Sequence, residues 1–317
     1  MDTSSRKSEN MTTTHEEQPL IPYRSVQNYF ATWESRAGYK LVLGGTRHHG
    51  YYKAGTRMPF PINPALRRME DHLYNTLDLP KGSEVLDAGC GVGHVAMYFA
   101  RKGLRVRGID LVENHILWAE RDIKAQGLDS QVSVRVGDYH HFDHISDTSL
   151  DGVFTMETFV HANDGRKVLN EFFRILKPGG TLALYEYWHV SDQEIPSDVP
   201  KHILESAKRV NKYGAMPTGE LLTKGVLRNW LKEQGFVDVE ETDLSENIAP
   251  MSFFFYLLGY IPFLIISFFG LQQYFVNTEA GVQGYRGLKR GLWGYASYKA
   301  KKPLGDTNTS DTGLRRR

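Results

Sequence analysis

The sequence has one cysteine, Cys90, among 317 residues, and it has almost no net charge. A single cysteine excludes an internal disulfide and a zinc site built from several cysteines, and it suits a reducing compartment. The 38 basic and 37 acidic residues give a net charge of +1, so the chain lacks the basic surplus of a nucleic-acid-binding protein. We therefore expect no metal site and no nucleic-acid partner.

The first twenty residues also lack the apolar core of a secretory signal. Residues 1–20 and 303–317 are polar, and we predict that both are disordered tails. Residues 21–79 are rich in aromatic side chains and predict a substrate cap with helices at about 25–43 and 63–77. A domain with alternating strands and helices follows at 80–246, then an apolar insertion at 247–290 and a last strand within 291–302.

Apolar runs of strand length alternate with helical stretches through the central domain. The predicted strands are residues 84–88, 104–110, 132–136, 152–156, 181–185, 236–242 and 292–298, and the predicted helices are 92–101, 114–126, 165–175 and 218–234. The sequence Lys-Pro-Gly-Gly at 177–180 predicts a sharp stop before the fifth strand. Repeated strand–helix units predict an α/β fold, a doubly wound, mostly parallel sheet with helices on both faces.

A glycine-rich loop follows the first predicted strand. It reads Asp87-Ala-Gly89-Cys90-Gly91-Val-Gly93, and His94 stands where a dinucleotide-binding loop has its third glycine. The spacing therefore argues against NAD. The carboxyl ends of the next two strands carry further candidate ligands of a nucleoside, and these are Asp110, Leu111, Asp138 and Tyr139. Carboxylates at this edge of a parallel sheet reach a bound ribose or base.

In these residues, and in Leu-Lys-Pro-Gly-Gly at 176–180, the sequence resembles the class I S-adenosylmethionine-dependent methyltransferases over residues 80–190. The resemblance implies seven strands with the last one antiparallel, and S-adenosylmethionine as the cofactor. It implies that Gly89 to Gly93 contact the methionine part of that cofactor. Cys90 has a competing interpretation as a nucleophile, but no base is assigned to it, and packing is favoured.

Two further segments resemble sterol 24-C-methyltransferases. Residues 154–162 read Phe-Thr-Met-Glu-Thr-Phe-Val-His-Ala, with Glu157 and His161 four positions apart, and residues 185–188 read Tyr-Glu-Tyr-Trp. The loop at 46–52, Thr-Arg-His-His-Gly-Tyr-Tyr, is instead similar to the tocopherol methyltransferases. The resemblance implies methylation of a carbon atom in a lipophilic, prenyl-derived acceptor.

Methyl transfer to an alkene forms a carbocation, which carboxylates and aromatic faces stabilise before a base removes a proton. The candidate catalytic residues are Glu157, His161, His49 and Glu186, and the candidate substrate-lining residues are Tyr51, Tyr52, Tyr185, Tyr187 and Trp188. His161 is the first choice of base and His49 the second. Three alternatives stay open: Glu157 holds the amino group of the methyl donor or caps a turn, His161 is a core or capping histidine, and the rings only pack in the core.

The run from Met251 to Leu271 has 21 residues without a charge. That length can span a bilayer, but strands on both sides require the chain to return to the same sheet. We predict a hairpin or a pair of short helices, bent at Pro262, that covers the substrate cavity and enters one leaflet. The alternative is a buried packing element. The predicted location is the cytoplasmic face of an intracellular membrane, the endoplasmic reticulum or a lipid droplet, and otherwise the cytoplasm.

The sequence thus predicts a methyltransferase of a sterol-like or other isoprenoid lipid that uses S-adenosylmethionine. One alternative is O-, N- or C-methylation of a lipophilic secondary metabolite. Another is a non-catalytic, membrane-associated binding protein with the same fold, which has no need of a complete cofactor site. The oligomeric state is not predicted.

Overall fold

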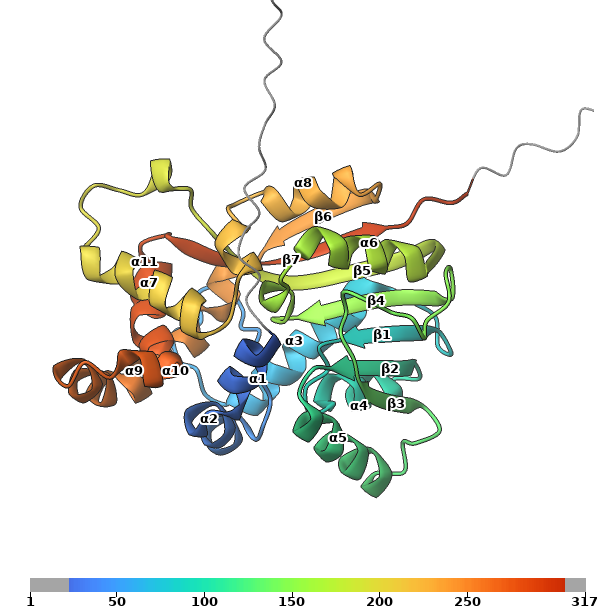
Figure 1. The fold of residues 1–317 in the computed structure, drawn as a ribbon, viewed down its shortest axis with the longest axis horizontal. Coiled ribbons are helices and arrows are strands. Elements are labelled where there is room, and N and C mark those ends of the chain that lie inside the picture. The colour runs from blue at the N-terminus through green and yellow to red at the C-terminus, as the bar shows by residue number, and fades with distance from the viewer. Residues whose placement is uncertain (1–22, 306–317) are drawn as a thin grey trace, which may run out of the picture.

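The computed structural model describes residues 23–305. The predicted tail at 1–20 and residues 306–317 lie outside this range. The described chain forms a seven-stranded sheet with helices on both faces (Figure 1).

The strand order is β3-β2-β1-β4-β5-β7-β6. The strands are β1 (Glu84–Ala88), β2 (Arg105–Asp110), β3 (Val132–Val136), β4 (Leu150–Met156), β5 (Leu176–His189), β6 (Val237–Asp243) and β7 (Trp293–Lys301). The first five strands run parallel, and β7 lies antiparallel between β5 and β6. The predicted α/β fold class is confirmed, including the antiparallel last strand.

The order of the strands reverses between β1 and β4, because the chain first adds β2 and β3 on one side and then β5 on the other. Ligands of open parallel sheets bind at this point, beyond the carboxyl ends of the strands. Helices α3 (Ile62–Leu77), α4 (His94–Arg101) and α5 (Glu113–Ala125) pack on one face of the sheet. On the opposite face lie α6 (Gly165–Ile175) and α8 (Val226–Glu233).

Two short helices, α1 (Tyr23–Ala31) and α2 (Trp33–Leu43), replace the single helix predicted at 25–43. Helix α1 crosses the carboxyl edge of the sheet beside β2: the Gln27 side chain donates to the carbonyl of Leu111 at 3.1 Å. The Phe30 ring lies 5.5 Å from the His115 ring and 5.3 Å from the His161 ring. The N-terminal cap therefore covers the point where the strand order reverses.

Two predicted boundaries are wrong. The helix expected at 218–234 is divided into a 3-10 turn, Thr218–Leu221, and α8, because Gly225 adopts φ +84° between them. Strand β5 begins at Leu176, so the Lys-Pro-Gly-Gly sequence lies inside the strand rather than before it. It forms the irregularity at which the pairing of β5 with β4 shifts, between Leu176 and Thr181. The sequence analysis did not predict α7 (Lys201–Tyr213) at all.

The apolar insertion begins with one helix, α9 (Ser245–Phe268), which continues through Pro250 and Pro262. The chain reverses at Gly270, where φ is +67°, and returns to β7 through four short elements. These are a 3-10 turn (Gln272–Tyr274), α10 (Val276–Glu279), a π-helical turn η5 (Ala280–Gly284) and α11 (Tyr285–Lys289). The predicted bend at Pro262 is therefore wrong. A proline removes only one hydrogen bond of a helix, whereas a left-handed glycine ends it.

Candidate functional site

The loop between β1 and α4 depends on its three glycines. Gly89, Gly91 and Gly93 have φ values of +91°, +53° and +77°, a region that other residues rarely adopt. A Cβ atom on Gly89 would lie 2.6 Å from Oγ1 of Thr158, the residue that follows Glu157 beyond β4. Only glycine therefore allows the loop to pack against the end of β4 and still leave its backbone close to a ligand.

Asp110 ties this loop to the end of β2. Its Oδ2 accepts from the backbone N–H of Gly91 at 2.9 Å, and its Oδ1 accepts from the N–H of Val112 at 2.8 Å. The imidazole Nδ1 of His115 lies 3.2 Å from the same Oδ1. A carboxylate oxygen has more than one lone pair, so Asp110 can also accept from ribose hydroxyls. Leu111 follows Asp110, and its carbonyl accepts from the Gln27 side chain.

Asp87 and Cys90 lie beneath the loop. The Asp87 side chain is buried, and its Oδ2 has no hydrogen-bond partner among the described residues. Burial raises its pKa well above the ordinary value, and the nearby Asp110 raises the pKa further. Burial also raises the pKa of the Cys90 thiol, with Asp87 and Asp110 adding to the shift. A buried neutral thiol is a poor nucleophile, so the geometry favours packing for Cys90.

Asp138 and Tyr139 lie at the end of β3, as predicted, and both have partners within the protein. Asp138 Oδ1 accepts from the backbone N–H of His140 at 2.9 Å and lies 2.6 Å from its Nδ1. The Tyr139 hydroxyl donates to the carbonyl of Thr158 at 2.9 Å. Tyr139 thus joins the loop after β3 to the loop after β4 and supports the crevice between them.

Glu157 directly follows β4 and has a strained conformation, with φ +58°. Its Oε1 accepts from the backbone N–H of His49 at 2.7 Å and lies 3.2 Å from His49 Nδ1, while its Oε2 accepts from the Tyr187 hydroxyl. Burial alone raises the pKa of Glu157, but His49 and Tyr187 outweigh it and the pKa lies below its ordinary value. Because an ionised carboxylate only accepts, His49 Nδ1 is the donor in this pair.

Two aromatic residues that the sequence analysis missed complete this cluster. The Tyr295 ring of β7 lies 5.3 Å from Tyr187 and 5.9 Å from His49, and the Phe255 ring of α9 lies 5.9 Å from His49. Tyr295 is the cross-strand partner of Tyr187. Nothing in the sequence marks either residue, because only the pairing of β5 with β7 and the packing of α9 bring them to His49.

Glu186 is fully buried. It precedes Tyr187 in β5, so its side chain points to the opposite face of the sheet. Its Oε1 accepts from the backbone N–H of Phe159 at 2.7 Å, and its Oε2 has no partner among the described residues. Burial, followed by the charge of Glu157, raises the pKa of Glu186 to about 8. Near neutral pH Glu157 is therefore the anion and Glu186 the neutral acid.

The Glu186→Gln variant tests this assignment. The ordinary pKa of 4.5 rises to about 8 on folding, so between these values the folded protein holds a proton that the unfolded chain has lost. The free energy of unfolding therefore falls as the pH rises through this window. We expect the variant, which cannot ionise, to gain about 3 to 4 kcal/mol relative to the parent between about pH 5 and pH 8. Urea unfolding at both pH values measures this, and an equal difference at the two would contradict the raised pKa.

His161 lies apart from the Glu157 cluster. Its Nδ1 is 2.8 Å from the carbonyl of Ala215, and burial lowers the pKa of the imidazole. Its ring faces Phe30 of α1. The structure therefore presents a neutral histidine beside the N-terminal cap, and its predicted role as the base stays a prediction.

The five predicted substrate-lining rings do not form one cavity. Tyr51 stacks on His72 at 5.1 Å, and the Tyr185 hydroxyl bonds to the same imidazole at 2.5 Å. The Tyr52 hydroxyl donates to the carbonyl of Pro59 within the packing of α3. Of the five side chains, that of Tyr187 bonds to the Glu157 carboxylate. Tyr185 meets Glu157 through its carbonyl, which accepts from the Glu157 N–H at 2.9 Å.

The position of Trp188 differs most clearly from the expectation that it lines the substrate cavity. It packs in the core on the face of the sheet that α6 and α8 cover, with Lys224 Nζ 4.7 Å from its ring. Alternate residues of a strand point to opposite faces, so Trp188 cannot share a cavity with Tyr187.

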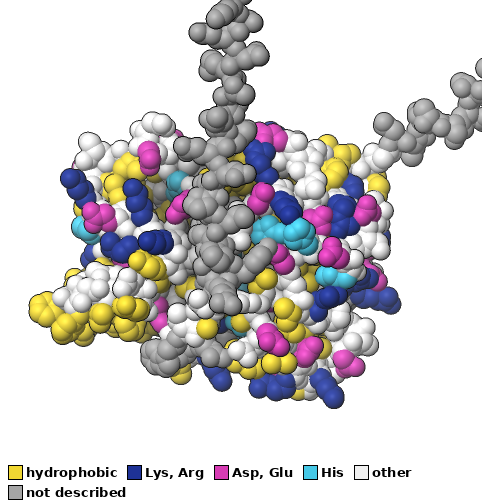
Figure 2. Space-filling model, viewed as in Figure 1, with side chains coloured by type: hydrophobic (Ala, Val, Ile, Leu, Met, Phe, Trp, Pro, Cys, Tyr) yellow, Lys and Arg dark blue, Asp and Glu magenta, His cyan; other side chains and the backbone are white. Residues whose placement is uncertain are grey.

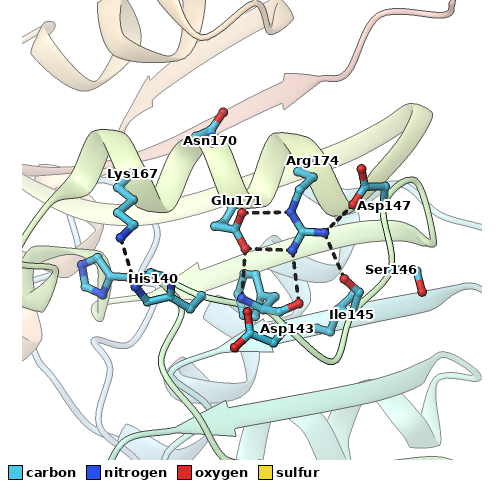
Figure 3. Close-up of a pocket in the computed structure, with 11 residues that line it drawn as sticks. His140, Asp143, Ile145, Ser146, Asp147, Lys167, Asn170, Glu171 and Arg174 are labelled. Atoms are coloured by element: carbon cyan, nitrogen blue, oxygen red, sulfur yellow. Dashed lines mark hydrogen bonds and ion pairs between the residues drawn. The ribbon is translucent and has the colours of Figure 1, made fainter.

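A hollow of about 400 Å³ lies away from these residues, between α6 and the loop that follows β3 (Figure 3). Arg174 crosses it and forms ion pairs with Glu171 and Asp147, at 2.8 and 2.5 Å. None of the predicted site residues lines this hollow. Because Arg174 is already paired with Glu171 and Asp147, we assign the hollow no part in the site.

Comparison with known proteins identifies the fold and the cofactor. Residues 86–184 match the family model described as a methyltransferase domain. An S-adenosyl-L-methionine-dependent Diels-Alderase of Talaromyces variabilis is 41% identical to the chain over 281 residues, which are 88% of this chain and 95% of that protein. The chain belongs to the class I S-adenosylmethionine-dependent methyltransferase family. The predicted cofactor is confirmed.

A solved structure agrees with this methyltransferase fold. The crystal structure of the 4+2 cyclase SpnF matches with a TM-score of 0.69 at 22% identity, over 92% of this chain and all of that one. The predicted resemblance to sterol 24-C-methyltransferases is also confirmed, but it is more distant. The enzyme of Eremothecium gossypii is 31% identical over 222 residues, which are 70% of this chain and 57% of that protein. The family therefore does not fix the reaction.

The residues of the loop fit S-adenosylmethionine. Gly89 to Gly93 leave open backbone for the methionine part, and Asp110 lies where the ribose hydroxyls are bound in this fold. The unpartnered Oδ2 of buried Asp87 offers a further acceptor under the same loop.

Proposed function

We propose that this protein binds S-adenosylmethionine and catalyses a 4+2 cycloaddition within a lipophilic polyene. The observation that carries the proposal is the extent of the similarity to the Talaromyces Diels-Alderase. The match covers 95% of that protein, whereas the methyltransferase domain covers only residues 86–184 here. It therefore includes parts of the chain that lie outside the cofactor domain, where substrate specificity resides.

A cycloaddition makes modest chemical demands on the protein. Two σ bonds form from π electrons of the diene and the dienophile, and no proton or leaving group moves. The enzyme has to fold the polyene, exclude water and polarise the electron-poor partner. Ionised Glu157 orients His49 and Tyr187, and the rings of Tyr295 and Phe255 enclose them, so the cluster can fold a polyene and exclude water. The Nδ1–H of His49 and the hydroxyl of Tyr187 already donate to Glu157, so polarisation of the dienophile falls to the positive charge of the bound cofactor.

The cofactor site adjoins this cluster. Thr158, next to Glu157, donates to the carbonyl of Ala88 at 2.8 Å and packs against Gly89. Bound S-adenosylmethionine supplies a fixed positive charge at this edge of the sheet, and it is not consumed. A polyene held over His49 would lie beside both the Glu157 cluster and the bound cofactor.

C-methylation of a sterol-like or other isoprenoid acceptor is the second candidate. The observation in its favour is the carboxylate of Glu157 against the faces of aromatic rings, an arrangement that stabilises a carbocation. The neutral imidazole of His161 is then the candidate base. Methylation of an oxygen or nitrogen atom would need only an activated acceptor.

An experiment with the natural precursor distinguishes cycloaddition from methylation. The gene is inactivated in the source organism, and the precursor that accumulates is isolated. The purified protein is then given this precursor with S-adenosylmethionine. A cyclase converts it to an isomer of the same mass and leaves the cofactor intact. A methyltransferase yields a product heavier by one methylene group and an equal amount of S-adenosylhomocysteine, a result that would refute the proposed cycloaddition.

A further inference from the structure

The outer part of the apolar insertion carries half of the exposed large hydrophobic side chains in the described chain. Residues 257–274, called the α9 tip below, contain nine of the eighteen large hydrophobic side chains that are exposed between residues 23 and 305. Phe268 is 84% exposed and Phe269 is 65% exposed. No charged residue lies between Glu246 and Glu279. Figure 2 shows these side chains gathered on one projection at the lower left, with Lys and Arg side chains on the neighbouring surface.

The inner half of α9 is covered, whereas most of the tip is exposed and only Phe263 and Ile266 of its residues are buried. A Cβ atom on Gly281 would lie 3.3 Å from the Phe255 side chain, and the Phe253 ring lies 5.4 Å from Tyr285. The returning segment thus packs along the first part of α9. Only 22% of the most apolar 18-residue stretch of α9 is buried inside the protein. A helix that is apolar all round and mostly exposed needs another apolar environment.

The backbone of the tip suits a surrounding without water. At the end of α9 the N–H groups of Phe269, Gly270 and Leu271 donate to the last carbonyls of the helix, at 3.2, 3.2 and 2.9 Å. These bonds satisfy the groups that a helix end usually leaves to solvent. Backbone that enters a bilayer must be satisfied internally in this way.

Aromatic and basic side chains surround the base of the tip. The guanidinium of Arg286 lies 5.8 Å from the rings of Tyr256 and Tyr260. On α7, the Tyr213 hydroxyl donates to Gln273 at 3.1 Å, and Lys212 lies against the Tyr213 ring. Tyrosine rings with lysine and arginine beside them are typical of the level of lipid headgroups, and the cations attract anionic lipids.

We infer that the α9 tip inserts into one leaflet of a phospholipid bilayer and fixes the protein to its surface. The tip does not cross the bilayer, because the chain returns to β7 on the side from which it left. The location predicted from the sequence, the cytoplasmic face of an intracellular membrane, stays a prediction.

The inner end of the same helix reaches the site. Met251 Sδ accepts from the N–H of Gly50 at 2.9 Å, and Phe255 lies against His49. Helix α9 therefore runs from the membrane-facing tip to the Glu157 cluster, and a lipophilic substrate can pass along it without entering water. This second step rests on the proposed function, whereas docking of the tip does not.

Flotation of the full-length protein with vesicles tests the docking, in the absence of cofactor and substrate. The vesicles contain three parts phosphatidylcholine and one part phosphatidylserine. We expect the protein to float with them, and the Ile265→Glu/Phe268→Glu variant to bind about a hundredfold more weakly, since two apolar side chains no longer leave water. The matched control is Leu117→Glu on α5, because Leu117 is 54% exposed and Ile265 is 57% exposed. The control should float as the parent does.

Recovery of the parent in the vesicle-free fraction, or equal flotation of parent and tip variant, would overturn the inference. So would a dimer of the parent in sedimentation velocity that the tip variant loses, since the tip would then bind a second copy of the chain. Far-ultraviolet circular dichroism checks that each variant is folded. None of these outcomes bears on the precursor experiment, which uses the protein in solution.

Discussion

Replacing Asp110 by alanine is expected to weaken the binding of S-adenosylmethionine by about a hundredfold. The carboxylate accepts from Gly91 in the glycine loop and from Val112, and it lies where ribose hydroxyls bind. Each hydrogen bond to a charged group contributes about 1.5–3 kcal/mol, so losing the ribose contact and the anchor of the loop accounts for this factor. Isothermal titration of the purified variant with S-adenosylmethionine measures it.

The control is Asp129→Ala. Asp129 is an exposed acid in the turn before β3, and its side chain has no ion pair or hydrogen bond with residues 23–305. Its loss should leave the dissociation constant unchanged. An Asp110→Ala protein that is folded and still binds the cofactor with the affinity of the parent would show that the glycine loop holds the cofactor without this carboxylate.

Replacing Glu157 by glutamine is expected to reduce product formation by about a hundredfold or more while the affinity for S-adenosylmethionine changes little. Three donor groups, from His49 and Tyr187, point at its two oxygens. Glutamine removes the negative charge and turns an N–H₂ group toward one of these donors, so His49 and Tyr187 lose their orientation. Displacing groups that position a substrate by about 1 Å reduces turnover by about a hundredfold. The measurements are turnover of the natural precursor and titration with the cofactor.

The matched variant is Glu240→Gln on β6, where the side chain is exposed and far along the sheet from Glu157. It should retain the turnover of the parent. If Glu157→Gln instead binds the cofactor much more weakly but regains full turnover at saturating cofactor, Glu157 holds the amino group of S-adenosylmethionine, which is one of the roles that the sequence leaves open.

The cofactor loop and the fold are local features, and the sequence predicts them well. Gly89, Gly91 and Gly93 all adopt positive φ, and the predicted strands match those observed within a few residues, apart from the early start of β5. Turn chemistry and the period of apolar residues depend on neighbours along the chain, so they can be read without knowing what packs where. The division of the helix at Gly225 was missed even though the glycine is visible in the sequence.

The side chains of β5 alternate between the two faces of the sheet, and this could have been inferred from the sequence once the segment was assigned to a strand. Tyr185 lies in the core on one face and Trp188 in the core on the other. By the alternation of a strand, Tyr187 points with Tyr185 and Glu186 with Trp188. A strand has a period of two residues, so consecutive residues cannot line one cavity. The aromatic cluster at 185–188 therefore separates into two environments as soon as it is placed in a strand.

By itself the sequence determined the α/β fold, the S-adenosylmethionine loop and the presence of a long uncharged segment, because short-range patterns specify each of them. Only the tertiary structure decided which acid is ionised and what surrounds it. Glu157 meets His49 across 108 positions of the chain and Tyr187 across 30. It also decided that α9 is one helix with an exposed tip and an inner end at His49. Contacts between distant segments set the local dielectric and the available partners, and no pattern along the chain contains them.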